Sequence, residues 1–130
     1  LAFIGDSYLS VGTPVQNALP ELFARAVPVR DAILARCVEN LELAFRMVAA
    51  FPGIELLAPG GGWSAVLRFP RVISEEALVM ELLERHGVAV YPGYFFDFAT
   101  EGYLVVSLIA APGVFSLGLK RTLDTIASRL

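Results

Sequence analysis

The sequence predicts an α+β fold in which a small mixed or antiparallel sheet is covered by helices on one side. Three observations lead to this prediction. A long segment, residues 28–51, has apolar residues at helical spacing and precedes most of the candidate strands. Short apolar runs of strand length then alternate with turn residues. Two further segments, one with an acidic start and one at the C-terminus, have the pattern of amphipathic helices.

The first 27 residues do not fit this pattern and are expected to form a separate part. Residues 1–13 are rich in turn residues. Thr13 is a good N-cap and Pro14 suits a first helical position, so a short helix is expected as far as about Ala26. Pro20 is expected to kink or shorten this helix. The predicted organisation is therefore residues 1–27 as a remnant of another domain and residues 28–130 as the domain itself.

The strongest structural signal is a helix from about Pro28 to Phe51. Pro28 suits the first turn, and Pro52-Gly53 ends the helix. One face is apolar and carries Leu34, Cys37, Val38, Leu41, Ala44, Phe45 and Val48. At 1.5 Å per residue the helix would be roughly 36 Å long, enough to cross a sheet and reach a neighbouring domain.

The remaining elements follow from local signals. Strands are expected at Ile54–Leu57, Trp63–Phe69, Val88–Tyr91 and Tyr103–Ile109. Alternation in the second strand places Ala65, Leu67 and Phe69 on one face. Ser74 is a good N-cap for a helix over Glu75–Arg85, with His86-Gly87 closing it. A turn at Pro112-Gly113 precedes the last helix, which is expected from about Ser116.

Composition excludes several classes of function. The chain has 130 residues and a net charge of −3, so it cannot neutralise a row of nucleic-acid phosphates. The single cysteine excludes an internal disulfide framework and indicates a reducing compartment, the cytoplasm. Residues 102–119 lack charge, but Pro112-Gly113 interrupts them and a spanning helix needs roughly 20 apolar residues, so no membrane segment is expected. The start carries Asp6 and no basic region, unlike a signal peptide.

The usual catalytic motifs have ordinary explanations. Residues 60–62 are three glycines, but they lead into a strand and lack the Gly-Lys-Ser/Thr of a phosphate loop, which favours a turn. With only one histidine, His86, and one cysteine, Cys37, neither a metal site nor a Cys–His nucleophile pair is expected. The carboxylates fall mostly on predicted solvated helix faces. Aromatic residues 95, 96 and 98 indicate either core packing or a ligand contact.

The motifs taken together resemble a known family. They are Gly61-Gly62-Trp63-Ser64-Ala65-Val66-Leu67, the acidic-capped helix, Gly87-Val88-Ala89-Val90-Tyr91-Pro92-Gly93-Tyr94-Phe95-Phe96, and Gly102-Tyr103-Leu104-Val105-Val106-Ser107. Their order and spacing resemble the C-terminal small domain of class I/II, fold type I aminotransferases, which depend on pyridoxal 5′-phosphate (PLP). The opening, Asp6–Ser10 and Thr13–Ala18, is similar to the stretch that follows the cofactor lysine. The resemblance covers nearly the whole chain.

The resemblance implies a small domain that closes over an active site built mainly by a larger domain. That larger domain would carry the lysine that binds PLP, the aspartate and the phosphate-binding residues. The long helix from Pro28 would pass between the two domains. The parent enzyme would transfer an amino group between an amino acid and a 2-oxo acid, and would be a homodimer. The isolated chain would expose apolar surface and could self-associate through it.

Two departures from the family matter. The only lysine, Lys120, matches no motif position, so the resemblance assigns no catalytic or cofactor-binding residue to this chain. The isolated chain is therefore expected to be inactive, with no cofactor and no metal bound. In the family's third-strand motif, Arg-x-Ser, the arginine clamps the substrate carboxylate. Here Val105 occupies the arginine position and Ser107 matches the serine.

Further residues follow from the same resemblance. It places Gly61, Gly62 and Phe96 at the rim of the active site. Arg68, on a neighbouring strand, could replace the missing arginine, although a surface salt bridge is the favoured role. Three alternatives stay open: a PLP-dependent lyase of the same fold (a carbon–sulfur lyase or a cyclopropane-forming synthase), the aminotransferase-like effector domain of a transcriptional regulator, and a non-enzymatic interaction module.

Overall fold

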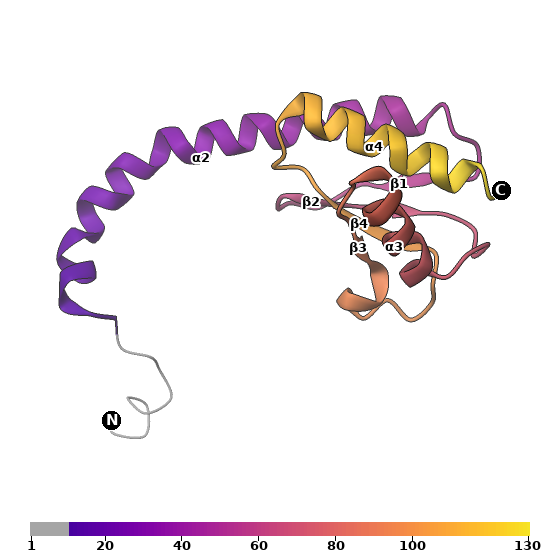
Figure 1. The fold of residues 1–130 in the computed structure, drawn as a ribbon. Helices are drawn as coiled ribbons and strands as arrows, with labels where there is room; N and C mark the ends of the chain where they lie inside the picture. The colour runs from indigo at the N-terminus through magenta and orange to yellow at the C-terminus, as the bar shows by residue number, and fades with distance from the viewer. Residues whose placement is uncertain (1–10) are drawn as a thin grey trace, which may run out of the picture. The chain divides into compact units, whose positions relative to one another are not determined.

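The computed structural model describes residues 11–130 (Figure 1). In chain order the elements of this range are α2 (Thr13–Val48), β1 (Glu55–Leu57), β2 (Ser64–Arg68), α3 (Glu75–His86), β3 (Tyr91–Pro92), the 3-10 helix η1 (Gly93–Phe96), β4 (Tyr103–Ser107) and α4 (Pro112–Ala127). The chain divides into two units, and the boundary between them in the sequence falls between Ile33 and Leu34. The predicted turn-rich opening and the family-like stretch Asp6–Ser10 lie outside the described residues, apart from residues 11–13.

The second unit confirms the predicted α+β fold. Its sheet has the order β1-β2-β4-β3, and every neighbouring pair is antiparallel. The central strands β2 and β4 pair from Ser64 opposite Ser107 to Arg68 opposite Tyr103. β3 is an edge strand of only two residues, and its Pro92 needs no ladder partner for a backbone N–H.

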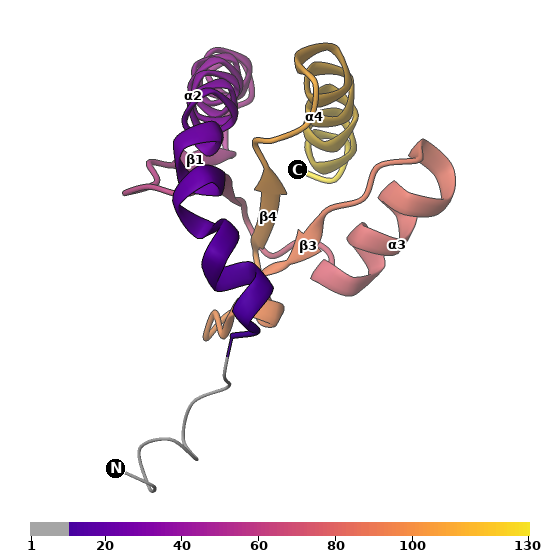
Figure 2. The same ribbon diagram turned by 90° about the vertical axis from the view of Figure 1, so that its left-hand side faces the viewer.

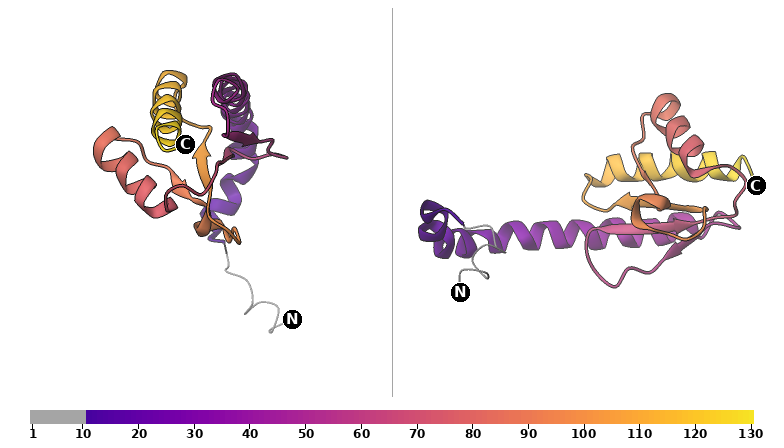
Figure 3. Two further views of the ribbon diagram at one scale, coloured as in Figure 1. Left: turned by 90° about the vertical axis from the view of Figure 1, so that its right-hand side faces the viewer. Right: turned by 90° about the horizontal axis from the view of Figure 1, so that it is seen from below.

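Alternation along the strands produces one buried and one open face. The buried face carries the fully covered Ala65 and Leu67 of β2 and Leu104 of β4. α3, α4 and residues 34–48 of α2 all lie on this face (Figure 2; Figure 3, left). These helices contribute the rest of the core, including Cys37, Ala44, Val48, Leu78, Leu82, Phe115, Leu119, Leu123 and Ile126.

The predicted N-cap and the predicted closing glycine of α3 are both confirmed. Ser74 Oγ accepts a hydrogen bond from Ala77 N at 3.2 Å, which caps the first turn. Gly87 closes the helix in the left-handed region at φ 63°. Its N–H donates to the carbonyl of Leu83 at 3.2 Å, and the N–H of Val88 donates to the carbonyl of Leu82 at 2.9 Å. These two caps fix both ends of the helix at the positions expected from the sequence.

A buried amide ties α2 to the segment that leads into α4. Asn40 is completely buried, and its Nδ2 donates to the carbonyls of Leu108 and Ala110, both at 2.8 Å. Both carbonyls belong to the segment that follows the end of β4, beyond the strand pairing of the sheet. The amide oxygen of Asn40 has no hydrogen-bond partner in the structure. Asn40 therefore fixes the turn between β4 and α4 through its donors alone.

The two N-terminal helices predicted from the sequence are one helix. α2 runs without interruption from Thr13 to Val48 and contains Pro20 and Pro28 in its interior. The prediction of a helix boundary near Pro28 was wrong because a proline's fixed φ is compatible with helix, and its cost is one lost hydrogen bond and local crowding. Good helix formers lie one residue further out on each side of Pro28, Ala24–Ala26 before it and Arg30 and Ala32 after it, and favour continuation of the helix.

Other boundaries differ by a few residues. The predicted strand Val88–Tyr91 is reduced to Tyr91–Pro92, since only these two residues pair with β4. α4 begins at Pro112, in place of the turn predicted there, because proline is well suited to the first helical position. α2 ends at Val48 and not at Phe51. β2 and β4 are each shorter than predicted by two residues, as is common at element ends.

Candidate functional site

The open face of the sheet carries a row of four neighbouring apolar or aromatic residues. Leu57 pairs with Val66, Val66 with Val105, and Val105 with Tyr91. Each of them alternates with a residue of the helix-covered core, so the row faces away from the helices. Val105 is only 5% exposed even here, because Val66 and Tyr91 flank it. Val105, which occupies the family's arginine position in the predicted resemblance, thus lies in the interior of an apolar row.

The single cation in the adjacent row of this face is already paired. Glu55, Arg68 and Tyr103 are register partners two residues along from the apolar row. Arg68 Nη2 donates to Glu55 Oε2, and both side chains are about half exposed. The hydrogen bond from Arg68 and the charge of Glu55 raise the pKa of the guanidinium above its ordinary value. This is the surface salt bridge that the sequence favoured for Arg68.

Ser107 and the glycine loop lie at one end of the central strands. Ser107 is exposed at the end of β4, opposite Ser64, and its hydroxyl accepts from Ile109 N at 3.4 Å. Gly61 and Gly62 lie in the loop just before Trp63 and β2 and are exposed, with open space where a Cβ would lie. Leu108 N donates to the carbonyl of Trp63 at 2.7 Å, which joins the end of β4 to the glycine loop.

Phe96 is linked to Val105 through Tyr91. The two rings of Tyr91 and Phe96 meet edge to face with centroids 6.2 Å apart, and Tyr91 is the register partner of Val105. Tyr94 and Phe95 also meet edge to face, at 5.0 Å. We call residues 91–96 the aromatic turn. The four aromatic side chains of this turn are between 47% and 63% exposed, so they form a surface patch and not a core.

Glu75 was not recognised from the sequence as more than an acid favourable at a helix start. It is completely buried, and its carboxylate accepts three backbone N–H groups. Oε1 accepts from Gly102 at 2.9 Å and from Tyr103 at 2.8 Å, and Oε2 accepts from Tyr94 at 3.1 Å. The amides belong to segments far away in the chain. The only sequence signal for this arrangement is a pair of glycines, Gly93 and Gly102, one on each side of residues 94–101.

Both glycines are required by close backbone approach. A Cβ on Gly93 would lie 2.7 Å from Tyr103 Cβ and 3.1 Å from Glu75 Oε1. Gly102 has φ 112°, and a Cβ there would lie 2.5 Å from the carbonyl oxygen of Phe69. The aromatic turn and the start of β4 can therefore come close enough to share one carboxylate.

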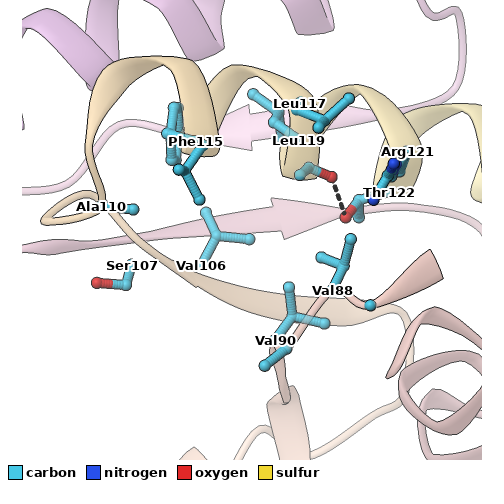
Figure 4. A pocket seen from close by; sticks show the side chains of 14 residues that line it. Val88, Val90, Val106, Ser107, Ala110, Phe115, Leu117, Leu119, Arg121 and Thr122 are labelled. Carbon is cyan, nitrogen blue, oxygen red and sulfur yellow. Dashed lines mark hydrogen bonds between the residues drawn. The ribbon is translucent and has the colours of Figure 1, made fainter. Parts of the chain in front are cut away.

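A cavity of about 360 Å³ lies on the helix-covered side, between α4 and the segment that leads into β3 (Figure 4). Val88, Val90 and Val106 line it from below and Phe115 and Leu119 from α4. Its polar groups are engaged: Thr122 Oγ1 donates to the Gly118 carbonyl, and Arg121 Nη1 donates to the His86 carbonyl. Of the predicted site residues only Ser107 reaches its edge, so the cavity is separate from the open-face row.

The described residues do not fit PLP on their own. Lys120 is on α4, its side chain is 62% exposed, and its Nζ is 2.6 Å from Asp124 Oδ2. Arg68 is paired with Glu55, and Arg71 with Glu101. Nowhere between residues 11 and 130 do three potential metal-ligating His, Cys, Asp or Glu side chains gather. Over the same residues, no helix is long and apolar enough to cross a membrane.

Comparison with known proteins identifies relatives of this chain. No family model matches it. It is 32% identical over 98 residues to an arginine–pyruvate transaminase of Pseudomonas aeruginosa, a match that covers 75% of this chain and 23% of that protein. The chain therefore spans about a quarter of the length of this relative.

Solved structures show the same fold. A PLP-dependent aminotransferase from Streptococcus suis superposes with a TM-score of 0.74 at 17% identity, over 84% of this chain and 29% of that one. An aromatic aminotransferase from Pyrococcus horikoshii gives 0.68 at 20% identity, over 81% and 28%. A PLP-bound structure from Clostridium difficile gives 0.76 at 19% identity, over 96% and 33%. The chain accordingly has the fold of a fold type I aminotransferase domain, and its 32% identity over three quarters of its length relates it to a transaminase.

Proposed function

We propose that this chain is the C-terminal part of a PLP-dependent aminotransferase that transfers an amino group between an amino acid and a 2-oxo acid. The observation that carries the proposal is the 32% identity to a transaminase over three quarters of the chain. In this proposal residues 28–130 are the small domain and residues 1–27 belong to the large domain. The enzyme is a cytoplasmic homodimer, and the large domain supplies the lysine and most of the cofactor site.

The open face of the sheet is the part of this chain that we assign to the substrate. It carries Val105 at the family's arginine position, with Phe96 connected to it through Tyr91. Gly61, Gly62 and Ser107 form the rim at one end of the central strands. An isopropyl group cannot make the charge-assisted hydrogen bonds by which arginine holds a carboxylate. Either another residue of the parent holds the substrate carboxylate, or the substrate presents a different group to this face.

We further propose that the isolated 130 residues do not catalyse transamination and bind no PLP. The chemical reason is that the reaction needs a lysine amine beside the substrate. Lys120 is on a solvent-facing part of α4 and is paired with Asp124. The chain by itself contributes orientation, an apolar wall and exclusion of water on the substrate side.

The proposal is tested by comparing two polypeptides. One is the 130-residue chain, and the other is the longer product obtained when the coding sequence upstream of Leu1 is included. Each is incubated with PLP, an amino acid and a 2-oxo acid, and the new amino acid is measured. Transfer by the longer product alone is expected. An upstream sequence without a lysine in a Ser/Thr-x-x-Lys setting, or equal transfer by the 130-residue chain, would overturn the proposal.

A further inference from the structure

Glu75 joins three separate parts of the fold by one buried charge. It is the first residue of α3, and its three N–H donors come from the aromatic turn (Tyr94) and from the start of β4 (Gly102 and Tyr103). No ion pair involving Glu75 occurs among the described residues. A buried carboxylate must have its oxygens satisfied by hydrogen bonds, so these amides are held to it tightly.

The two carboxylate oxygens hold different segments. Oε1 holds the start of β4 through two amides, at 2.9 and 2.8 Å. Oε2 holds the aromatic turn through one amide, at 3.1 Å. Tyr94 lies in the first turn of η1, where backbone N–H groups have no partner within the helix. The attachment of the turn therefore depends on Oε2 being an acceptor.

The aromatic turn has few other attachments. β3 contributes only two register pairs with β4, and the side chains of Tyr94, Phe95 and Phe96 are about half exposed. Behind the turn, Gly93 is buried and leaves no room for a Cβ against Tyr103 and Glu75. The backbone of the turn is thus pressed onto the carboxylate while its rings face outwards.

We propose that Glu75 is a positioning residue for the aromatic turn, and that Oε2 sets the place of Tyr91, the register partner of Val105, and of Phe96, whose ring meets that of Tyr91. The importance of this placement for a substrate rests on the proposed function. The attachment itself does not, because it is complete within this chain. Glu75 touches no substrate in this account and acts only through the turn.

Glu75→Gln separates the two attachments. Its amide oxygen can replace Oε1 and keep the Gly102 and Tyr103 bonds, whereas its NH₂ group then faces the Tyr94 N–H as a second donor. Glu76→Gln is the matched control, because it removes the same charge from the same helix turn at an exposed side chain. Both variants and the wild-type 130-residue chain are compared by amide hydrogen exchange in nuclear magnetic resonance (NMR).

We expect the Tyr94 amide of Glu75→Gln to exchange about 10- to 100-fold faster than in the wild type, the range for a lost bond to a charged acceptor. Gly102, Tyr103 and the amides of the β2–β4 ladder should change much less, and the Phe96 ring signals should shift. Glu76→Gln should leave all of them unchanged. A uniform acceleration of all amides would show a merely structural role and overturn the proposal, as would an unchanged Tyr94.

The wild type gives a second test that holds even if the variant does not fold. The Tyr94 amide should be protected to a degree similar to Gly102 and Tyr103, although it lies in an exposed turn. An unprotected Tyr94 amide beside protected Gly102 and Tyr103 amides would overturn the proposal. Since none of these measurements needs PLP, they can fail while the transaminase proposal stands, and the reverse also holds.

Discussion

At Val105 the sheet presents an isopropyl group to its open face, between Val66 and Tyr91. The one cation in the adjacent row, Arg68, forms an ion pair with Glu55. The hydrogen bond to Glu55 and the charge of Glu55 raise the pKa of the Arg68 guanidinium. Freeing Arg68 for a substrate carboxylate would therefore require breaking this pair. The apolar row and the adjacent row of this face therefore offer an anionic substrate no unpaired cation.

A substitution at this position tests that conclusion. In the longer enzyme we expect Val105→Arg to lower the KM for an α-amino acid about tenfold or more, because a hydrogen bond to a charged group is gained. Steady-state kinetics with the same amino acid and 2-oxo acid measure the change. Val66→Arg is the control, since it places the same charge one strand away on the same face.

An unchanged KM in Val105→Arg would show that the carboxylate is already held elsewhere in the enzyme. Equal decreases in both variants would mean that any positive charge on the face suffices, and would contradict a specific role for position 105.

The residue scale also shows what sequence reasoning could reach. The Arg68–Glu55 pair could be expected because surface arginines on strands commonly find carboxylates. The role of Glu75 could not, because its three partners are backbone amides brought together only by the fold. Nothing in the side-chain types at positions 94, 102 and 103 records that their N–H groups share an acceptor.

Among the elements, those with complete local signals were predicted best. α3 has a side-chain N-cap at Ser74 and a left-handed glycine at Gly87, and both ends were placed correctly. β2 was found from its alternation alone. The length of β3 was overestimated, because its pairing with β4 stops after two residues. The apolar residues Val88 and Val90 lie before the strand and line the helix-covered cavity.

α2 gives the element-scale prediction, because Pro28 lies in its interior. Pro28→Ala should restore the N–H that can donate to the carbonyl of Ala24 and should remove the ring's crowding, a gain of up to about 3 kcal/mol for the helix. Circular dichroism during thermal unfolding and NMR amide exchange of residues 24–33 measure it. Pro112→Ala is the control, since Pro112 is already at a favourable first position of α4.

Slower amide exchange around residue 28 in Pro28→Ala, with little change in Pro112→Ala, is the expected result. Faster exchange or a loss of helical signal in Pro28→Ala would contradict this. It would mean that Pro28 occupies a favourable first position of a separate helix in solution, as the sequence predicts.

For the whole molecule, the fold class could be predicted from the order of elements, whereas the proposed function rests on motif order and the comparisons. The sheet with helices on one face was predictable because alternation and helical spacing are local patterns. The substrate could not be predicted, because no motif in this chain is specific for one amino acid or one 2-oxo acid. Residues 11–130 provide a sheet face and an aromatic turn, and no described lysine beside either.

The most direct test of the central claim is reductive labelling of the 130-residue chain. The chain is incubated with PLP, treated with borohydride and analysed by mass spectrometry, with Lys120→Arg as the control for surface reaction. We predict no stoichiometric incorporation, because Lys120 is paired with Asp124 on α4, away from the open face. Stoichiometric incorporation, at Lys120 or anywhere else in the chain, would contradict the claim that this domain depends on a lysine supplied by another part of the enzyme.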